Sequence, residues 1–156
     1  MREPVQVLII PYIFVDSDVQ VLILKRRKGA YWQFISGGME YGETLEDTAK
    51  RETYEEIGTK ISDLFSLQTR TMIPANVFNY NFRTDPIFVF EYTFAFHLKD
   101  IQNVILSEEH SNYQIVTYKE AMKCLKWDSN KTALYELFKT MRWNVSNKID
   151  KDIFML

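Results

Sequence analysis

Three glutamates near the middle of the chain are spaced so that their carboxylates would meet on one face of a helix. Glu52, Glu55 and Glu56 occupy positions i, i+3 and i+4, and side chains so spaced are neighbours on a helical surface. Like charges that close repel each other, so the arrangement needs cations to offset it. Hard divalent cations bind carboxylate oxygens together with water and phosphate oxygens. The spacing therefore predicts a site for Mg²⁺, with Mn²⁺ as a substitute.

The helix that would carry these carboxylates has recognisable ends. Thr44 can accept hydrogen bonds from backbone N–H groups, and Asp47 follows three residues later, which is a variant of the capping box. Gly58 is typical of the residue that ends a helix. A helix from near Thr44 to Gly58 is therefore expected.

Glycines precede this helix. Gly37, Gly38 and Gly42 let the backbone turn tightly and bring carbonyl and N–H groups close to a metal ion and its phosphate. Within the helix, Arg51 can reach Glu55 at i+4, but it neutralises only one of the three glutamates.

Together these residues resemble the Nudix box. The pattern is G, five residues, E, seven residues, R-E, two residues, E-E, one residue, G. The positions that fill it are Gly37, Glu43, Arg51, Glu52, Glu55, Glu56 and Gly58. Thr53 and Thr59 stand where the family usually has an aliphatic residue, and threonine keeps a methyl group for packing. The resemblance implies an α/β fold of the Nudix type, an α/β/α sandwich around a mixed β-sheet with a loop-helix-loop catalytic motif.

The resemblance also implies hydrolysis of a phosphoanhydride, which needs metal ions to neutralise phosphate oxygens and acidify the attacking water. The metal would be held by the carboxylates of Glu52, Glu55 and Glu56 and by a backbone carbonyl near Ser36 or Gly37.

Three further residues receive catalytic roles from the resemblance. Glu109 stands where relatives place a metal-bound or general-base carboxylate; the alternative is a solvated loop glutamate beside Glu108. Arg51 is expected to orient a motif carboxylate through a bidentate contact. Glu43 would either bind a second metal through water or pair with a basic group.

Substrate contacts are less well defined. Arg26 and Arg27 could meet the outer phosphates, although basic pairs that end a strand are usually solvated. Trp32 and Phe34 could stack on a base or pterin, although aromatics beside a turn often belong to the core.

Short segments outside the motif resemble the dihydroneopterin triphosphate and dATP pyrophosphatase branch of the family. They are Trp32-Gln33, Ser36-Gly37, Glu109-His110, Tyr113 and residues 127–131. This branch implies a small triphosphate cut between its α and β phosphates, with pyrophosphate leaving intact. The alternatives are hydrolysis of ADP-ribose or dinucleoside polyphosphates, or a non-catalytic nucleotide-binding module. An allylic diphosphate isomerase would want a cysteine in the site, and Cys124 lies far from the motif in sequence.

Composition limits the other possibilities. A chain of 156 residues with 46% hydrophobic content suits a single domain, residues 1–156. The net charge of −2 indicates no broad surface for polymeric nucleic acid. The longest apolar run, residues 7–15, contains Pro11 and is too short to span a bilayer, so neither a membrane partner nor a signal peptide is expected. A cytoplasmic location is predicted, and the oligomeric state is left open.

The surrounding elements follow from periodicity. Residues 5–15 and 19–25 read as antiparallel strands that are apolar on both faces, which predicts a sheet between helices. Another strand is expected within residues 64–73, and residues 87–98 alternate as a half-buried strand with its aromatic face in the core. Helices are expected near residues 119–125 and 130–142, and no pattern is clear after Trp143.

Overall fold

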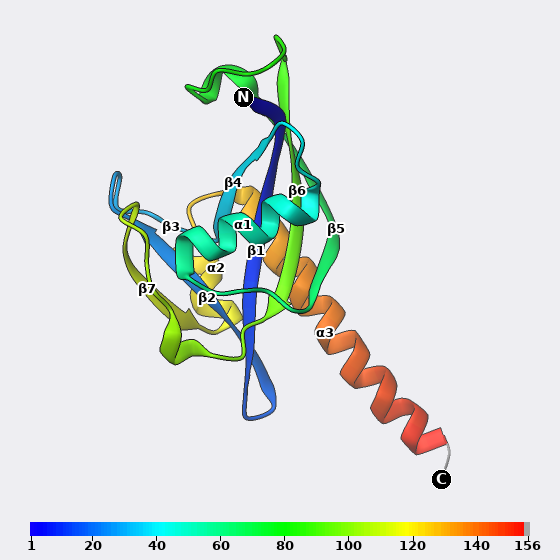
Figure 1. The fold of residues 1–156 in the computed structure, drawn as a ribbon. Coiled ribbons are helices and arrows are strands. Elements are labelled where there is room, and N and C mark those ends of the chain that lie inside the picture. Colours follow the sequence, from blue (N-terminus) through cyan, green and yellow to red (C-terminus); the bar gives the residue numbers. More distant parts are fainter. Residues whose placement is uncertain (155–156) are drawn as a thin grey trace.

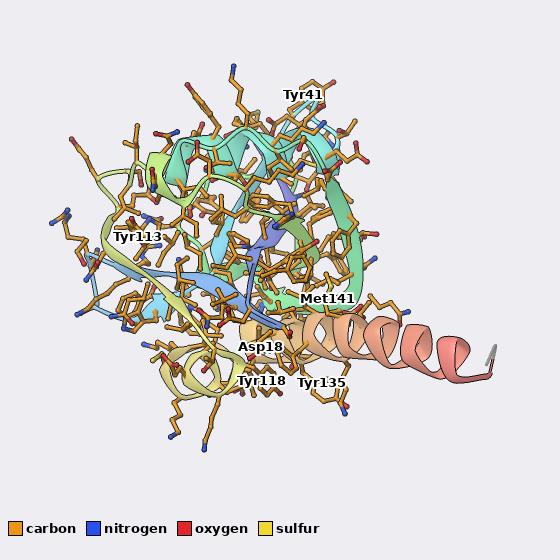
Figure 2. The ribbon with its side chains drawn as sticks, turned by 90° about the horizontal axis from the view of Figure 1, so that it is seen from below. Asp18, Tyr41, Tyr113, Tyr118, Tyr135 and Met141 are labelled. Carbon is orange, nitrogen blue, oxygen red and sulfur yellow. The ribbon has the colours of Figure 1, made fainter. Side chains whose placement is uncertain are left out.

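A seven-stranded mixed sheet lies between helices that pack on both of its faces (Figure 1). The computed structural model describes the backbone of residues 1–154 and the side chains of residues 1–141. Helix α1 (Leu45–Ile57) covers one face, and α2 (Tyr118–Cys124) and α3 (Asp128–Phe154) cover the other. Figure 2 shows Tyr118 and Tyr135 on the side of the molecule opposite α1. The predicted α/β/α sandwich is confirmed.

The central strand of the sheet is β1. It pairs antiparallel with β2 and β4 and parallel with β6, and β5 then extends the sheet beyond β6. Strand β7 and the short β3 both pair with β2. The strands are β1 (Arg2–Val15), β2 (Asp18–Arg26), β3 (Trp32–Gln33), β4 (Ile35–Glu40), β5 (Leu64–Pro74), β6 (Phe88–His97) and β7 (His110–Val116).

The antiparallel hairpin predicted at the start of the chain is confirmed, and both of its faces are buried. Val7 and Ile9 belong to the core under α1, whereas Leu8 and Ile10 belong to the core under α2 and α3. Alternate side chains of a strand point to opposite faces, so a strand that is apolar throughout needs a cover on each side. The helices provide it.

Strand β6 lies where it was predicted, but the expected burial of its aromatic face is wrong over the first half. Phe88 and Phe90 are 38% and 43% exposed, whereas Glu91 and Thr93, on the other face, are buried. Only from Tyr92 onward does the aromatic face enter the core under α1. Alternation shows that the two faces differ, but it does not show which part of each face another element covers.

The edge strand β5 contains a bulge that α3 holds in place. The register of β5 against β6 shifts between Ser66 and Arg70. Glu136 of α3 accepts hydrogen bonds from the backbone N–H groups of Gln68 and Thr69, at 2.6 and 2.7 Å, and from the Thr69 hydroxyl at 2.6 Å. Partial burial opposes ionisation of this carboxyl, but the hydrogen bonds from Gln68 and Thr69 outweigh it and lower its pKa.

The two C-terminal helices are confirmed with different ends. Helix α3 starts at Asp128 and its backbone stays helical to Phe154, past the region where the sequence shows a pattern, so that it projects beyond the sheet (Figure 1). Residues 155 and 156 lie outside the described residues, and the single domain of residues 1–156 remains a prediction. Within residues 1–154, no helix is both long enough and apolar enough to cross a membrane.

Candidate active site

The motif helix α1 has the ends that its sequence predicts. The Thr44 side chain accepts from the Asp47 N–H, and the Asp47 carboxylate accepts from the Thr44 N–H, each at 3.1 Å. Gly58 follows the helix with φ of 72°, and its N–H donates to the Tyr54 carbonyl at 2.9 Å. The caps set the ends of the helix, and the packing of Ala49 and Ile57 in the core turns Glu52 and Glu56 inward while Glu55 stays exposed.

Glu52 lies directly against the backbone of β4. A Cβ atom placed on Gly37 would overlap the carboxyl group of Glu52, so only glycine permits this approach. Burial raises the pKa of Glu52, and the neighbouring guanidinium of Arg51 opposes that rise. The motif glycine and the motif glutamate therefore form one structural unit.

Arg51 makes the bidentate contact that was expected, and its main partner is Glu43. Its Nε and one terminal nitrogen lie 2.7 and 2.9 Å from the two Glu43 oxygens. It also donates to Glu52 at 2.8 Å and to the Gly38 carbonyl at 2.9 Å. The hydrogen bonds from Arg51 lower the pKa of Glu43 to about 2. Of the two roles open for Glu43, the structure thus shows pairing with a basic group.

Glu56 is a buried carboxylate with one unpartnered oxygen. It is 5% exposed, and its Oε2 has no hydrogen-bond partner among the described residues. Burial raises its pKa well above the ordinary value, and the charges of Glu52 and Glu109 add to the rise. An ionised carboxylate in this position is costly unless a cation neutralises it.

The donor set fits a hard divalent cation, because an unpartnered buried carboxylate oxygen lies in the field of other carboxylates. In the described side-chain positions, no three acidic, histidine or cysteine groups are already arranged as a metal site. The exposed Glu55 would therefore have to turn toward Glu52 and Glu56 to complete one.

The loop before β7 brings the distant carboxylate to this helix. The Ser107 N–H donates to the Glu56 carbonyl at 3.1 Å, and the exposed Glu109 lies near enough for its charge to raise the pKa of Glu56. His110 is buried behind it, with Nε2 at 4.0 Å from Glu56 Oε2. The sequence associated His110 with the pyrophosphatase branch through the pair Glu109-His110 but gave it no role in the site. Its position next to Glu109 was the signal that could have linked it to the site.

The two predicted phosphate-binding arginines differ in their surroundings. The charge of Arg26 lowers the pKa of Glu56, which places it by the site, and its buried Nε has no hydrogen-bond partner among the described residues. Arg27 is occupied with the loop before β7: its Nε donates to the Glu108 carbonyl at 3.0 Å, and its backbone N–H to the Glu109 carbonyl at 2.8 Å. Arg27 therefore anchors that loop.

The predicted stacking of a substrate ring on Phe34 is wrong. Phe34 is fully buried in the core under α2 and α3, and its N–H donates to the Asn130 side chain at 2.9 Å. Trp32 packs partly against the same core. Nearby, Trp127 exposes 42% of its surface while its indole N–H donates to Gln33 at 3.1 Å, so it offers a ring that Phe34 cannot.

The isomerase alternative finds no support in the position of the cysteine. Cys124 is exposed at the end of α2, which packs on the face of the sheet opposite α1. An acid/base cysteine would have to lie beside the carboxylates of α1.

Comparison with known proteins places the chain in a family. The family model of the NUDIX domain matches residues 6–138, and the chain belongs to the Nudix family. A protein of Listeria monocytogenes, solved as a NUDIX hydrolase, is 41% identical with a TM-score of 0.82, over 91% of this chain and 97% of that one. Family, motif and relatives identify an enzyme of the Nudix hydrolase class.

Two other relatives have more informative names. The dihydroneopterin triphosphate pyrophosphohydrolase of Escherichia coli is 23% identical and has a TM-score of 0.73 over 89% of this chain and 97% of that one, so the two share a fold. An RNA pyrophosphohydrolase of Aeromonas hydrophila is 44% identical over 57 residues, which is 36% of this chain. This match spans only a third, 33%, of that relative's length.

Proposed function

We propose that the protein is a metal-dependent pyrophosphohydrolase that cuts a nucleoside or pterin triphosphate between its α and β phosphates and releases pyrophosphate. The observation that carries the proposal is the pair of buried carboxylates, Glu52 and Glu56, that α1 places against Gly37 and near Glu109. The names of the E. coli and Aeromonas relatives support diphosphate chemistry.

In this proposal Glu52, Glu55 and Glu56 hold Mg²⁺, or Mn²⁺ in its place, with help from the carbonyl of Ser36 or Gly37. The bound cation supplies neutralisation of the phosphate oxygens and acidification of the attacking water. Arg51 orients Glu52, and Glu43 in turn holds Arg51 through both of its oxygens.

Glu109 is the proposed proton acceptor, because it is exposed to solvent at the edge of the site and its charge acts on Glu56. Glu109→Gln should lower kcat by a factor on the order of 10² with a much smaller change in KM, as expected for a lost general base. Steady-state kinetics at saturating Mg²⁺ measure both constants.

Glu108→Gln is the matched control for that experiment. Glu108 is the adjacent exposed glutamate, and it contacts Arg27 through its backbone carbonyl, so the substitution should have little effect. Equal and small effects of the two substitutions would assign the loop to solvent and return the base to α1.

The substrate's phosphates and ring are proposed to meet different residues. Arg26 pairs with His110 between β2 and β7, its charge acts on Glu56, and it is the candidate for an outer phosphate. Trp32 and the exposed Trp127 are candidates for the ring, and stacking on an aromatic contributes about 1–3 kcal/mol whatever the hydrogen-bonding edge. Broad preference among planar bases is therefore expected.

The cytoplasmic location remains a prediction.

A panel of substrates with Mg²⁺, with phosphate and pyrophosphate quantified separately, tests the proposal. Nucleoside and dihydroneopterin triphosphates should give pyrophosphate and a monophosphate product. A specificity constant roughly tenfold higher for ADP-ribose or a dinucleoside polyphosphate would overturn the substrate assignment. Binding without turnover of any compound would instead identify a nucleotide-binding module.

A further inference from the structure

A second arginine, outside the motif, reaches the same backbone group as Arg51. Arg2 is the first residue of β1, and a terminal nitrogen of its side chain donates to the Gly38 carbonyl at 2.6 Å. Arg51 donates to that oxygen at 2.9 Å. Both donors are charged, and charge-assisted hydrogen bonds are stronger and more directional than neutral ones. The Gly38 carbonyl is therefore fixed by two guanidinium groups.

The position of the Arg2 side chain is itself built from several segments. Its guanidinium lies 4.7 Å from the ring centre of Tyr80, and its Nε lies 3.4 Å from a Glu40 oxygen. The Arg2 carbonyl also accepts from the Arg83 N–H at 2.9 Å. These contacts hold most of the side chain away from solvent, with 27% of it exposed.

Gly38 provides the space that Arg2 occupies. A Cβ atom on Gly38 would overlap the Arg2 guanidinium, and Gly38 does not have the positive φ that requires glycine. The Nudix pattern fixes Gly37 but leaves the next position open. The missing side chain at Gly38 is thus explained by Arg2.

We propose that Arg2 is a positioning residue of the active site, which acts with Arg51 on the Gly38 carbonyl to hold the β4 backbone in the place where Gly37 meets Glu52. This inference rests on the proposed function, because the geometry it protects is that of the metal-binding carboxylates. Small displacements of such groups have large effects on binding and catalysis.

Mn²⁺ affinity without substrate, measured by electron paramagnetic resonance or calorimetry, tests the inference. Arg2→Met should raise the Kd on the order of tenfold, the range seen when outer partners of metal ligands are removed. Arg2→Lys should recover part of the loss. Gly38→Ala should have a similar effect by displacing the Arg2 side chain. Arg2→Met and Gly38→Ala both remove the contact between Arg2 and Gly38. The double variant should therefore bind Mn²⁺ no more weakly than either single variant.

Arg83→Met is the matched control. Arg83 also forms an ion pair, at 2.6 Å with Glu3, and a ring contact, at 5.2 Å with Tyr41, but no described contact joins it to Gly38. Its Mn²⁺ affinity should equal that of the wild type, and circular dichroism should show all variants folded.

The outcomes separate this inference from the proposed function. A wild type that binds no Mn²⁺ would overturn both. A wild type that binds Mn²⁺, with Arg2→Met indistinguishable from Arg83→Met, would overturn the role of Arg2 and leave the metal-dependent function standing. Additive losses in the double variant would show that Arg2 does not act through Gly38.

Discussion

Replacing Glu56 with glutamine should lower kcat by a factor on the order of 10² or more, through lost metal binding and charge stabilisation, yet raise the melting temperature of the metal-free protein. The gain in stability follows because the folded chain buries this carboxylate beside other negative charges. Turnover at limiting Mg²⁺ and thermal unfolding in EDTA measure the two effects.

The stability gain from Glu56→Gln should depend on pH in a defined direction. The pKa of Glu56 is raised in the folded state, so folding favours the protonated carboxyl and disfavours the ionised one. Below the ordinary glutamate pKa both folded and unfolded chains are protonated, so the variant should gain little there. As the pH rises from the ordinary glutamate pKa to the raised folded-state pKa, the metal-free wild type loses stability and the difference between the two melting temperatures should grow. Above the folded-state pKa this difference should level off.

The control for this pair of effects is Glu46→Gln. Glu46 is an exposed residue of the first turn of α1, so its loss should change neither turnover nor the pH dependence appreciably. Normal turnover of Glu56→Gln at limiting Mg²⁺ would show that the carboxylates of α1 are not the metal site.

Gly37→Ala should damage both activity and stability. The added Cβ would overlap the Glu52 carboxyl group, and relieving that overlap must displace this carboxylate, either by turning the side chain or by moving α1 away from β4. We expect a loss of kcat on the order of 10² from misplaced catalytic groups, and a loss of about 1–3 kcal/mol in the free energy of unfolding from overpacking. Steady-state kinetics and urea unfolding report these quantities.

Gly42→Ala separates close approach from backbone strain. Gly42 has φ of 90°, but nothing lies within 4 Å of a Cβ placed there. Its replacement should cost roughly 1–2 kcal/mol of stability through left-handed strain while most of the activity remains. A loss of activity as large as that of Gly37→Ala would mean that contact with Glu52 is not what makes Gly37 necessary.

Local signals predicted the parts of the fold that local physics determines. The ends of α1 depend on Thr44, Asp47 and Gly58, which act on their own neighbours in sequence, and all three have the roles expected of them. The burial of each face of β6 depends on which other elements cover it, and that is not encoded in the residues of β6 themselves. Phe34 shows the same limit, because an aromatic beside a glycine loop is equally compatible with a ring site and a core position.

In the active site, too, some contacts could be predicted from the sequence and others could not. The spacing in the motif was enough to identify Glu52 and Glu56 as neighbours, whereas Glu43, the bidentate partner of Arg51, lies eight residues away and was not identified by spacing. The approach of His110 to Glu56 and of Arg2 to Gly38 depends on strand pairing between distant segments. Such contacts arise from tertiary structure and leave no periodic signal in the sequence.

The bulge in β5 bears on how copies of this chain behave when they meet. Strand β5 ends the strand order of the sheet, and a long edge with free backbone groups is a template on which another molecule can add a strand and begin aggregation. Glu136 binds the N–H groups of Gln68 and Thr69 within the bulge, and the bulge interrupts the regular backbone of β5. The Glu136 carboxylate on α3 thus opposes the addition of a strand from another molecule at β5. Protonation of Glu136 in acid would remove this protection.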